Sequence, residues 1–313
     1  MLTTITITAP IFLLIALGYG AVMTGGMPRE AAGALGRFVV AFAIPALIFD
    51  AVASRPLAEV VNGRFLLVYG GGSLIAFSAG LLVSTWLRRR PLADNAFFGM
   101  GISMSNSALI GYPLILQLFG EEALVAIPLV MLVETLLMLP LTLVLAEIQR
   151  AGTGGGMLAS LRNIVRQLVT NPILLAIVAG LCCAAFGIRL PTVVGRAVEL
   201  LTGSAAGVAL FTIGASLAGL RLRSAVSAAA LIAAGKLLIH PLAVGLLLAI
   251  ALPFNPVLMQ AALVLAALPM ITIYPLLAQR YGHGEVAAAA LLVTTAASFV
   301  TLTVGIWLLG IGS

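Results

Sequence analysis

The chain has 313 residues, of which 62% are hydrophobic and only 8% are charged, and its formal net charge is +6. Soluble domains carry about 25% charged residues, so this composition excludes an ordinary water-soluble domain. The mean hydropathy of +1.21 and the recurring apolar runs predict a polytopic all-α membrane protein, because about 20 apolar residues cross a bilayer. The apolar segments are too long for a membrane β-barrel, and no basic run suggests binding to nucleic acid.

Polar residues and turns divide the chain into ten predicted transmembrane helices. They are 5–23, 32–53, 65–87, 95–119, 123–146, 168–187, 197–219, 225–251, 256–280 and 286–309. The first has no Lys or Arg before it, so we interpret it as a membrane helix and not as a cleaved signal peptide. The one long connection, 149–167, is Gly-rich and basic, and we interpret it as a loop between a first five-helix repeat, 1–148, and a second, 168–313.

The arginines predict how the chain is oriented. Eleven fall in the loops of one side: Arg29, Arg37, Arg88, Arg89, Arg90, Arg150, Arg162, Arg166, Arg221, Arg223 and Arg280. Four fall in the loops of the other side: Arg55, Arg64, Arg189 and Arg196. Because cytoplasmic loops carry an excess of Lys and Arg, we expect 149–167 in the cytoplasm and both termini outside. The predicted location is the bacterial inner membrane.

The two halves repeat each other at a constant offset of 162 residues. The stretch APIFLLIALG, 9–18, resembles NPILLAIVAG, 171–180, and the Tyr-Pro pair at Tyr112 recurs at Tyr274. Further identities at this offset pair Gly18 with Gly180, Phe49 with Phe211, Ser54 with Ser216, and Pro91 with Pro253. Because five spans are an odd number, the second half must enter the membrane from the opposite side. This predicts an inverted 5+5 repeat, which is typical of secondary transporters.

The fourth and ninth spans each carry polar residues and prolines at mid-span, in MSNSALIGYP (104–113) and LPMITIYP (268–275). Proline removes a backbone hydrogen bond, so we predict that both helices break there and cross. Pro113 and Pro275 would begin the second half-helices, whose N–H groups would face a carboxylate substrate. The alternative is that these prolines only kink the helices. The predicted substrate-binding residues are Asn106, Ser107, Tyr112, Pro113, Pro269, Thr272, Tyr274 and Pro275.

At these residues the sequence resembles the auxin efflux carrier family, within the larger group of bile acid/sodium symporters. The resemblance is carried by MSNSALIGYPLI, AALPMITIYPLLAQRYG, AIPALIFDAV and ALFTIGASLAGL. It implies a scaffold of helices 1, 2, 6 and 7, a transport domain of helices 3–5 and 8–10, and an elevator-like movement. It also implies binding at Asn106, Pro113, Pro269 and Pro275. Bacterial members that resemble this chain are described as malonate or malate carriers, and the long central loop of the plant carriers is missing here.

Ionisable residues inside a span cost at least about 2.5–3.5 kcal/mol and are functional hypotheses by default. Glu134, followed by Thr135, is predicted to carry a proton or to bind Na⁺; the alternative is a protonated Glu bonded to another helix. A Na⁺ site would use Asn106, Ser107, Glu134 and Thr135. Lys236 is expected to attract an organic anion or to pair with Glu134, and His240 lies one turn later on the same face. Asp50 either takes part in gating or coupling or faces interfacial water.

The favoured function is secondary active transport of a small organic anion such as malonate or malate, coupled to H⁺ or Na⁺, with no other cofactor. The alternatives are an uncoupled channel or facilitator and an auxin-like exporter of aromatic acids. An enzyme is not expected, because the chain lacks HExxH, GxSxG and paired acidic motifs. The GxxxG pattern Gly203–Gly207 indicates either tight helix packing or a homodimer contact.

Overall fold

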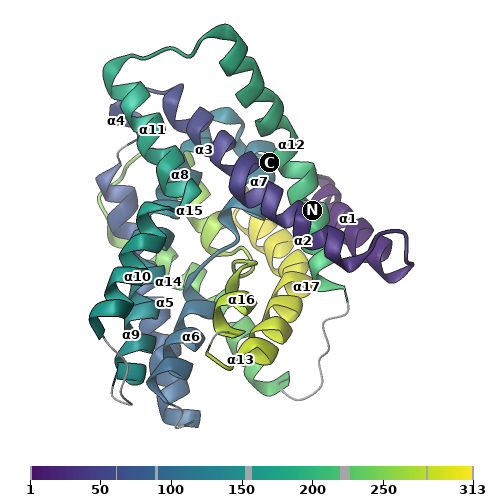
Figure 1. Cartoon of the computed structure of the whole chain (residues 1–313), viewed down its shortest axis with the longest axis vertical. Coiled ribbons are helices and arrows are strands. Elements are labelled where there is room, and N and C mark those ends of the chain that lie inside the picture. The colour runs from purple at the N-terminus through teal and green to yellow at the C-terminus, as the bar shows by residue number, and fades with distance from the viewer. Residues whose placement is uncertain are drawn as a thin grey trace.

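A computed structural model describes residues 2–60, 62–88, 91–151, 157–218, 226–279 and 281–311, and every element it assigns in these ranges is a helix (Figure 1). The first half contains α1 (Leu2–Met23), α2 (Arg29–Phe38), η1 (Val39–Ala43), α3 (Ile44–Ala53), α4 (Leu57–Val60), α5 (Gly63–Arg88), α6 (Leu92–Ser103), η2 (Ser107–Gly111), α7 (Tyr112–Phe119), η3 (Glu121–Val125), α8 (Ala126–Val133), η4 (Glu134–Met138) and α9 (Leu139–Ala151). The second half contains α10 (Met157–Val169), α11 (Pro172–Phe186), α12 (Thr192–Leu217), α13 (Val226–Ala234), η5 (Gly235–Ile239), α14 (His240–Ile250), α15 (Pro256–Ala266), α16 (Tyr274–Gln279) and α17 (Gly284–Leu308).

The described residues form a multi-pass helical membrane protein. Seven continuous helices are long and apolar enough to cross a bilayer, and an eighth crossing results if α10 and α11, bent by 51° to each other, count as one. The predicted fourth and ninth spans are absent from this count because each is divided into shorter helices. The number of ten spans and the 5+5 repeat therefore stay predictions.

Four prolines explain where the helices change their winding. The π-helical segments η1, η2, η4 and η5 are each followed, two residues after they end, by a proline: Pro45, Pro113, Pro140 and Pro241. A proline within a helix cannot donate the i→i−4 hydrogen bond, and a π-turn rearranges the bonding just before it. These segments contain Ser107, Glu134 and Lys236, so the prolines also set the positions of site residues.

The helices pack as two groups. In the first helix group, defined as α1, α2–η1–α3, α11 and α12, α1 packs against α12 and α3 packs against α11. In the second helix group, defined as α5–α9 and α13–α17, α5 packs against α6 and α14, while α17 packs against α13 and α16. The groups meet where α1 contacts α7 and α17, and where α12 contacts η2.

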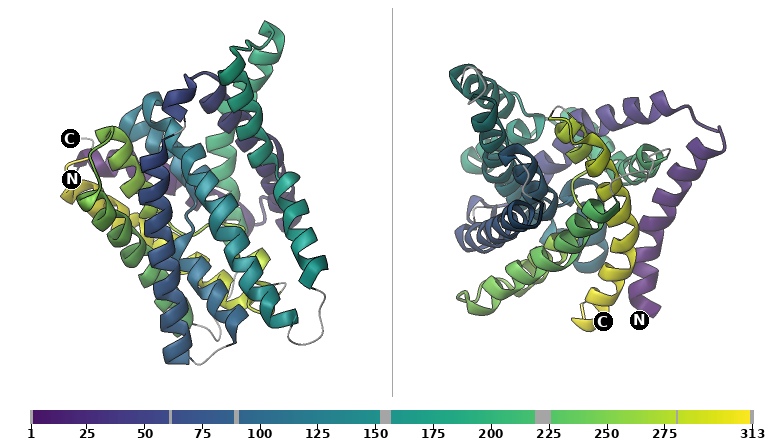
Figure 2. Two further views of the ribbon diagram at one scale, coloured as in Figure 1. Left: turned by 90° about the vertical axis from the view of Figure 1, so that its left-hand side faces the viewer. Right: turned by 90° about the horizontal axis from the view of Figure 1, so that it is seen from below.

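Glycines allow two very close helix contacts in the first helix group. A Cβ atom on Gly18 would lie 1.9 Å from the carbonyl oxygen of Phe211, and one on Gly214 would lie 1.7 Å from that of Ile15. Only a residue without a side chain fits at these distances, so the backbones of α1 and α12 touch. The two chain termini lie side by side (Figures 1 and 2), and the hydroxyl oxygens of Thr8 and Thr303 are 3.1 Å apart.

The segment 149–167 differs from the predicted loop. α9 extends to Ala151, and residues 157–169 form the helix α10. The sequence did not predict this amphipathic helix, because Gly-rich residues precede it and its apolar residues are too few to resemble a membrane span. Among the arginines used to predict orientation, Arg89, Arg90, Arg221, Arg223 and Arg280 lie outside the described residues, and the orientation stays a prediction.

Candidate functional site

Two interrupted segments meet in the middle of the molecule. α6 ends at Ser103 and α15 ends at Ala266, and in both places the chain continues without regular helix. The backbone N–H of Asn106 donates to the carbonyl of Pro269 at 2.9 Å, and Ser105 and Met270 form a single antiparallel bridge. We call residues 104–106 and 267–273 the crossing. The two segments therefore satisfy each other's backbone groups, which is required of irregular chain at membrane depth.

The side chain of Asn106 strengthens this contact. Its amide nitrogen donates to the hydroxyl of Thr272 at 2.7 Å, so a residue of the predicted fourth span is tied to one of the ninth. Asn106 also precedes the helix formed by η2 and α7, but its side chain does not cap that helix. A helix that lacks a side-chain cap has backbone N–H groups available for another acceptor at its N-terminus.

The prolines of the predicted site lie differently from expectation. Pro113 does not begin the second half-helix, because the helix already starts at Ser107 and the break precedes it at 104–106. The π-turns of η2 accommodate Pro113 without a break. Pro275, in contrast, is the second residue of α16, close to the expected position. Pro269 lies within the crossing and is buried.

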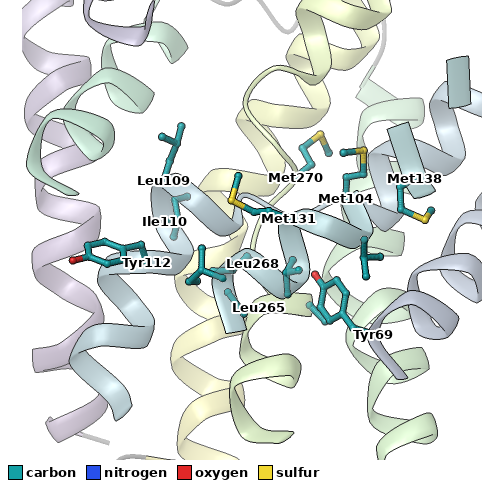
Figure 3. Packing of buried hydrophobic residues seen from close by; sticks show 14 of the residues in the cluster. Tyr69, Met104, Leu109, Ile110, Tyr112, Met131, Met138, Leu265, Leu268 and Met270 are labelled. Carbon is teal, nitrogen blue, oxygen red and sulfur yellow. The ribbon is translucent and has the colours of Figure 1, made fainter. Parts of the chain in front are cut away.

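The two tyrosines do not converge on the crossing. Tyr274 is 2% exposed and its ring packs over Gly101 of α6, where an added Cβ would lie 3.0 Å from its hydroxyl. Tyr112 points away from the crossing, on the side opposite to Tyr69, whereas Met104 and Met270 are part of the crossing and Met131 lies beside them (Figure 3). Methionine side chains are adaptable, so the crossing lies in surroundings that can repack.

Glu134 is the first residue of η4, and its carboxylate reaches the N-terminal end of η2, where the second half of the interrupted fourth helix begins. One of its carboxylate oxygens, Oε1, accepts a hydrogen bond from the backbone N–H of Ser105 at 2.7 Å and from the hydroxyl of Ser107 at 3.2 Å. The side chain is 4% exposed. A carboxylate at a helix N-terminus is stabilised by the partial positive charge of that end.

Lys236, in η5, reaches the C-terminal end of α15. Its Nζ donates to the carbonyl of Ala266, the last residue of α15, at 2.7 Å and to the hydroxyl of Ser105 at 2.8 Å. The side chain is fully buried. A cation is favoured at a helix C-terminus, where unpaired carbonyls accumulate. Glu134 and Lys236 thus complement the two opposite half-helix ends that meet at the crossing.

His240 completes the coordination of Lys236. The Nζ atom of Lys236 lies 2.8 Å from Nδ1 of His240, and Nε2 of His240 lies 3.0 Å from the hydroxyl oxygen of Ser73. An ammonium group can only donate, so Nδ1 accepts and Nε2 carries the proton and donates to Ser73. Ser73 reaches this position because its neighbour Gly72 lets α5 approach α14 closely: a Cβ there would lie 2.5 Å from a methyl group of Val244.

Ser105 connects these groups, although the predicted site did not include it. Its hydroxyl accepts hydrogen bonds from Lys236 and, at 3.2 Å, from Tyr69, and its N–H donates to Glu134. Sequence reasoning also missed Tyr69, Ser73 and the Ala266 carbonyl. The only available signal was that Tyr69 and Ser73 are polar residues around a Gly triplet in an otherwise apolar span. A backbone carbonyl leaves no signal in a sequence.

The remaining predicted residues lie apart from this network or add no contact to it. Thr135 is buried next to Glu134. Asp50 lies in the last turn of α3, where its electrostatic neighbours are Glu199 and Glu121, so it does not join Lys236. Close by, the guanidinium of Arg55, two residues after the end of α3, donates to the backbone carbonyls of Glu121 and Glu122 and so links the end of the first helix group to the second.

A metal site is not evident among the described residues, since none of their His, Cys, Asp and Glu side chains form a group of three or more. The predicted Na⁺ ligands Asn106, Ser107, Glu134 and Thr135 are neighbours in space or sequence. Asn106, however, directs its amide nitrogen toward Thr272, and Ser107 donates to Glu134. The arrangement supplies a buried carboxylate, a buried ammonium group and the N-terminus of η2, which has no side-chain cap.

Comparison with known proteins agrees with a transport role. Residues 3–307 match the model of a family described as "Membrane transport protein". A protein of Rhizobium meliloti (strain 1021) named "Putative malonate transporter" is 30% identical over 308 residues, which are 97% of this chain and 95% of that protein. An "Uncharacterized transporter" of Methanothermobacter thermautotrophicus is 30% identical over 235 residues, 74% of each chain.

These matches confirm the resemblance inferred from the sequence, and they indicate a transporter and not an enzyme. Both relatives are named as transporters, and the family model extends over nearly the whole chain, including both segments of the crossing. The chain belongs to the membrane transport protein family.

Proposed function

We propose that the protein is a secondary active transporter of a small organic anion of the malonate or malate type. The observation that carries this proposal is the crossing, where two interrupted helices meet around a buried Glu134 and Lys236. Ionisable groups at this depth are costly and mark transport pathways. The name of the Rhizobium meliloti relative supports malonate as the first substrate to test.

The chemistry of the crossing favours a carboxylate. The helix that begins at Ser107 has no side-chain cap, and Asn106 and Thr272 offer neutral donors and acceptors beside it. Lys236 adds a positive charge, which attracts anions and repels cations. Both effects are stronger in a medium of low dielectric constant than in water. A small dicarboxylate presents enough oxygens to bind Asn106, Thr272 and the free N–H groups together.

Ten spans in an inverted 5+5 arrangement are part of the same proposal. The seven continuous helices, the crossing formed by α11 with the adjoining end of α10, and the two interrupted helices add up to ten. Gly18 contacts Phe211, and Gly180 contacts Phe49, which are pairs related by the offset of 162. We propose that the first helix group is the scaffold, and that the second moves past it as an elevator that carries the crossing.

The coupling ion we favour is H⁺, bound at Glu134. The positive charge of Lys236 balances the negative charge of the Glu134 carboxylate. Protonation of Glu134 removes that negative charge and raises the net charge at the crossing by one unit. Such a change alters how strongly the site attracts an anion. Na⁺ at Asn106, Ser107, Glu134 and Thr135 is the alternative, and the experiment below distinguishes the two ions.

A homodimer is a further part of this proposal. Among the described residues, no other atom lies within 4 Å of a Cβ added to Gly203 or Gly207, so these glycines do not serve packing there, as the first interpretation of the GxxxG pattern required. Both lie on the exposed side of α12. Small residues on an exposed face permit close approach of a second helix, and crosslinking of Gly203→Cys in membranes tests this contact.

Transport itself is tested with the purified protein in liposomes. Labelled malonate uptake is expected to saturate, to accelerate when unlabelled malonate is present on the opposite side, and to follow a pH gradient. Glu134→Gln is expected to abolish the dependence on that gradient, because the amide cannot bind or release a proton. Uptake without acceleration from the opposite side would indicate a channel. Uptake that follows a Na⁺ gradient would reject H⁺ as the coupling ion.

A further inference from the structure

The helix α10 differs from the membrane spans in how its residues are distributed. At about 100° per residue, Leu158, Leu161, Val165 and Val169 fall within an arc of about 80°, and all four side chains are exposed, Leu158 by 82%. Arg162 and Arg166 continue the same surface next to this arc and are exposed as well. The helix contains no Asp or Glu. It therefore presents an apolar strip bordered on one side by positive charge.

The flank of the helix on the other side of the strip fixes its place on the protein. Ile164 is only 7% exposed, and α10 packs against α9. The strip lies between this buried flank and the two arginines and is itself exposed, so its occupant has to offer both an apolar layer and negative charge. A second protein chain would be required to match this combination, whereas an anionic bilayer surface provides it without further assumptions.

The geometry of the next helix locates α10 relative to the membrane. α11 has 15 residues, which at 1.5 Å each span about 22 Å, less than the roughly 30 Å of a hydrocarbon core. α10 joins it at a bend of 51°. The end of α10 near Val169 must therefore supply the missing depth, and the bend directs the rest of the helix out of the path of α11.

We infer that α10 is an interfacial helix that binds anionic phospholipid, with the apolar strip in the acyl boundary and Arg162 and Arg166 on headgroup phosphates. Arginine pairs well with phosphate and reaches from an apolar face to the headgroups. Because α10 lies between α9 of the second helix group and α11 of the first, bound lipid contacts the connection between the two groups. This inference does not depend on the substrate that the protein carries.

The first test measures lipid selectivity of the full chain. The protein is incorporated into nanodiscs of phosphatidylglycerol and phosphatidylcholine, and lipids retained after extraction are counted by native mass spectrometry. Each basic residue near an anionic surface contributes about 1 kcal/mol, or about fivefold. Arg162→Gln with Arg166→Gln is expected to lower the preference for phosphatidylglycerol by up to about 30-fold, and 1 M salt is expected to weaken the wild-type preference.

The matched control is Arg189→Gln with Arg196→Gln, which removes the same charge from the connection after α11 and from the first turns of α12, and is expected to keep the preference. Equal preference in the wild type and the α10 variant would overturn the inference, as would equal losses in both variants.

The second test measures depth, independently of lipid choice. Nitroxide labels are placed at Leu158→Cys and Arg162→Cys in a Cys182→Ser, Cys183→Ser background, and their accessibility to oxygen and to a nickel chelate is compared. We expect position 158 just inside the acyl boundary and position 162 at the headgroups. A water-exposed label at 158 would contradict interfacial binding, and labels at the bilayer centre at both positions would make α10 part of a membrane span.

Discussion

The first helix group and the crossing are stabilised by contacts of different kinds. In the first helix group the contacts are apolar and follow the internal repeat: Gly18 lies against Phe211 of α12, and Gly180 lies against Phe49 of α3. Each residue of one contact is related to its equivalent in the other by 162 positions. The packing of these helices therefore has the symmetry of the sequence.

The crossing lacks that symmetry in its charges. At the offset of 162, Glu134 corresponds to Ala296, and Lys236 corresponds to Leu74. Each half thus contributes one buried charge that the other half does not have, and the two charges meet through Ser105. The internal repeat thus accounts for the packing of the first helix group, whereas the buried charges of the crossing lie at positions where the two halves differ in sequence.

The strongest test of this comparison removes one charge. Lys236→Met leaves the Glu134 carboxylate buried without its counter-charge, which typically costs about 3–5 kcal/mol. We expect a large fall in the unfolding temperature in detergent and loss of malonate uptake. Combining it with Glu134→Gln is expected to restore most of the stability but not the transport. A single variant as stable as the wild type would show that the charges are not coupled.

A second test addresses the symmetric contacts. Gly18→Ala would place a Cβ atom 1.9 Å from the carbonyl oxygen of Phe211, so α1 and α12 must separate. Overpacking of this kind costs about 1–3 kcal/mol, which thermal unfolding of the detergent-solubilised protein measures. Gly305→Ala is the control, because its Cβ would have no neighbour within 4 Å in the described part of the chain. Equal stability of Gly18→Ala and the control would contradict the close contact.

The smallest expected effect is at the contact between the two helix groups. Arg55→Gln removes the hydrogen bonds to the carbonyls of Glu121 and Glu122. Exposed contacts of this kind contribute less than about 1 kcal/mol, so the unfolding temperature should hardly change. If this contact must open during transport, uptake should rise about two- to fivefold. A lower unfolding temperature with unchanged uptake would assign Arg55 a purely structural role.

The sequence revealed the places of both interruptions because prolines and polar residues recur there in two apolar spans. It did not predict where the second half of the fourth helix begins, since a proline marks strain but not the turn that absorbs it: the chain opens at 104–106, and η2 winds as a π-helix from Ser107, before Pro113. Glu134 and Lys236 were recognisable as ionisable residues within spans.

The network around these two charges was beyond sequence reasoning. Tyr69, Ser73 and Ser105 come from different helices, and only tertiary packing brings them to Lys236 and His240. The helix α10 was missed for another reason: its apolar residues are spaced for one face only, and the preceding Gly-rich stretch reads as a loop. Periodicity along the chain detects an element, but not its neighbours.

Binding of the carried anion at the crossing is tested most directly by counterflow of labelled malonate into liposomes. Asn106→Ala loses the hydrogen bond to Thr272, a contribution of about 1 kcal/mol, so the variant should insert and fold. We predict that it fails to exchange malonate while the wild type exchanges it. Exchange at the wild-type rate by Asn106→Ala would contradict the proposed site.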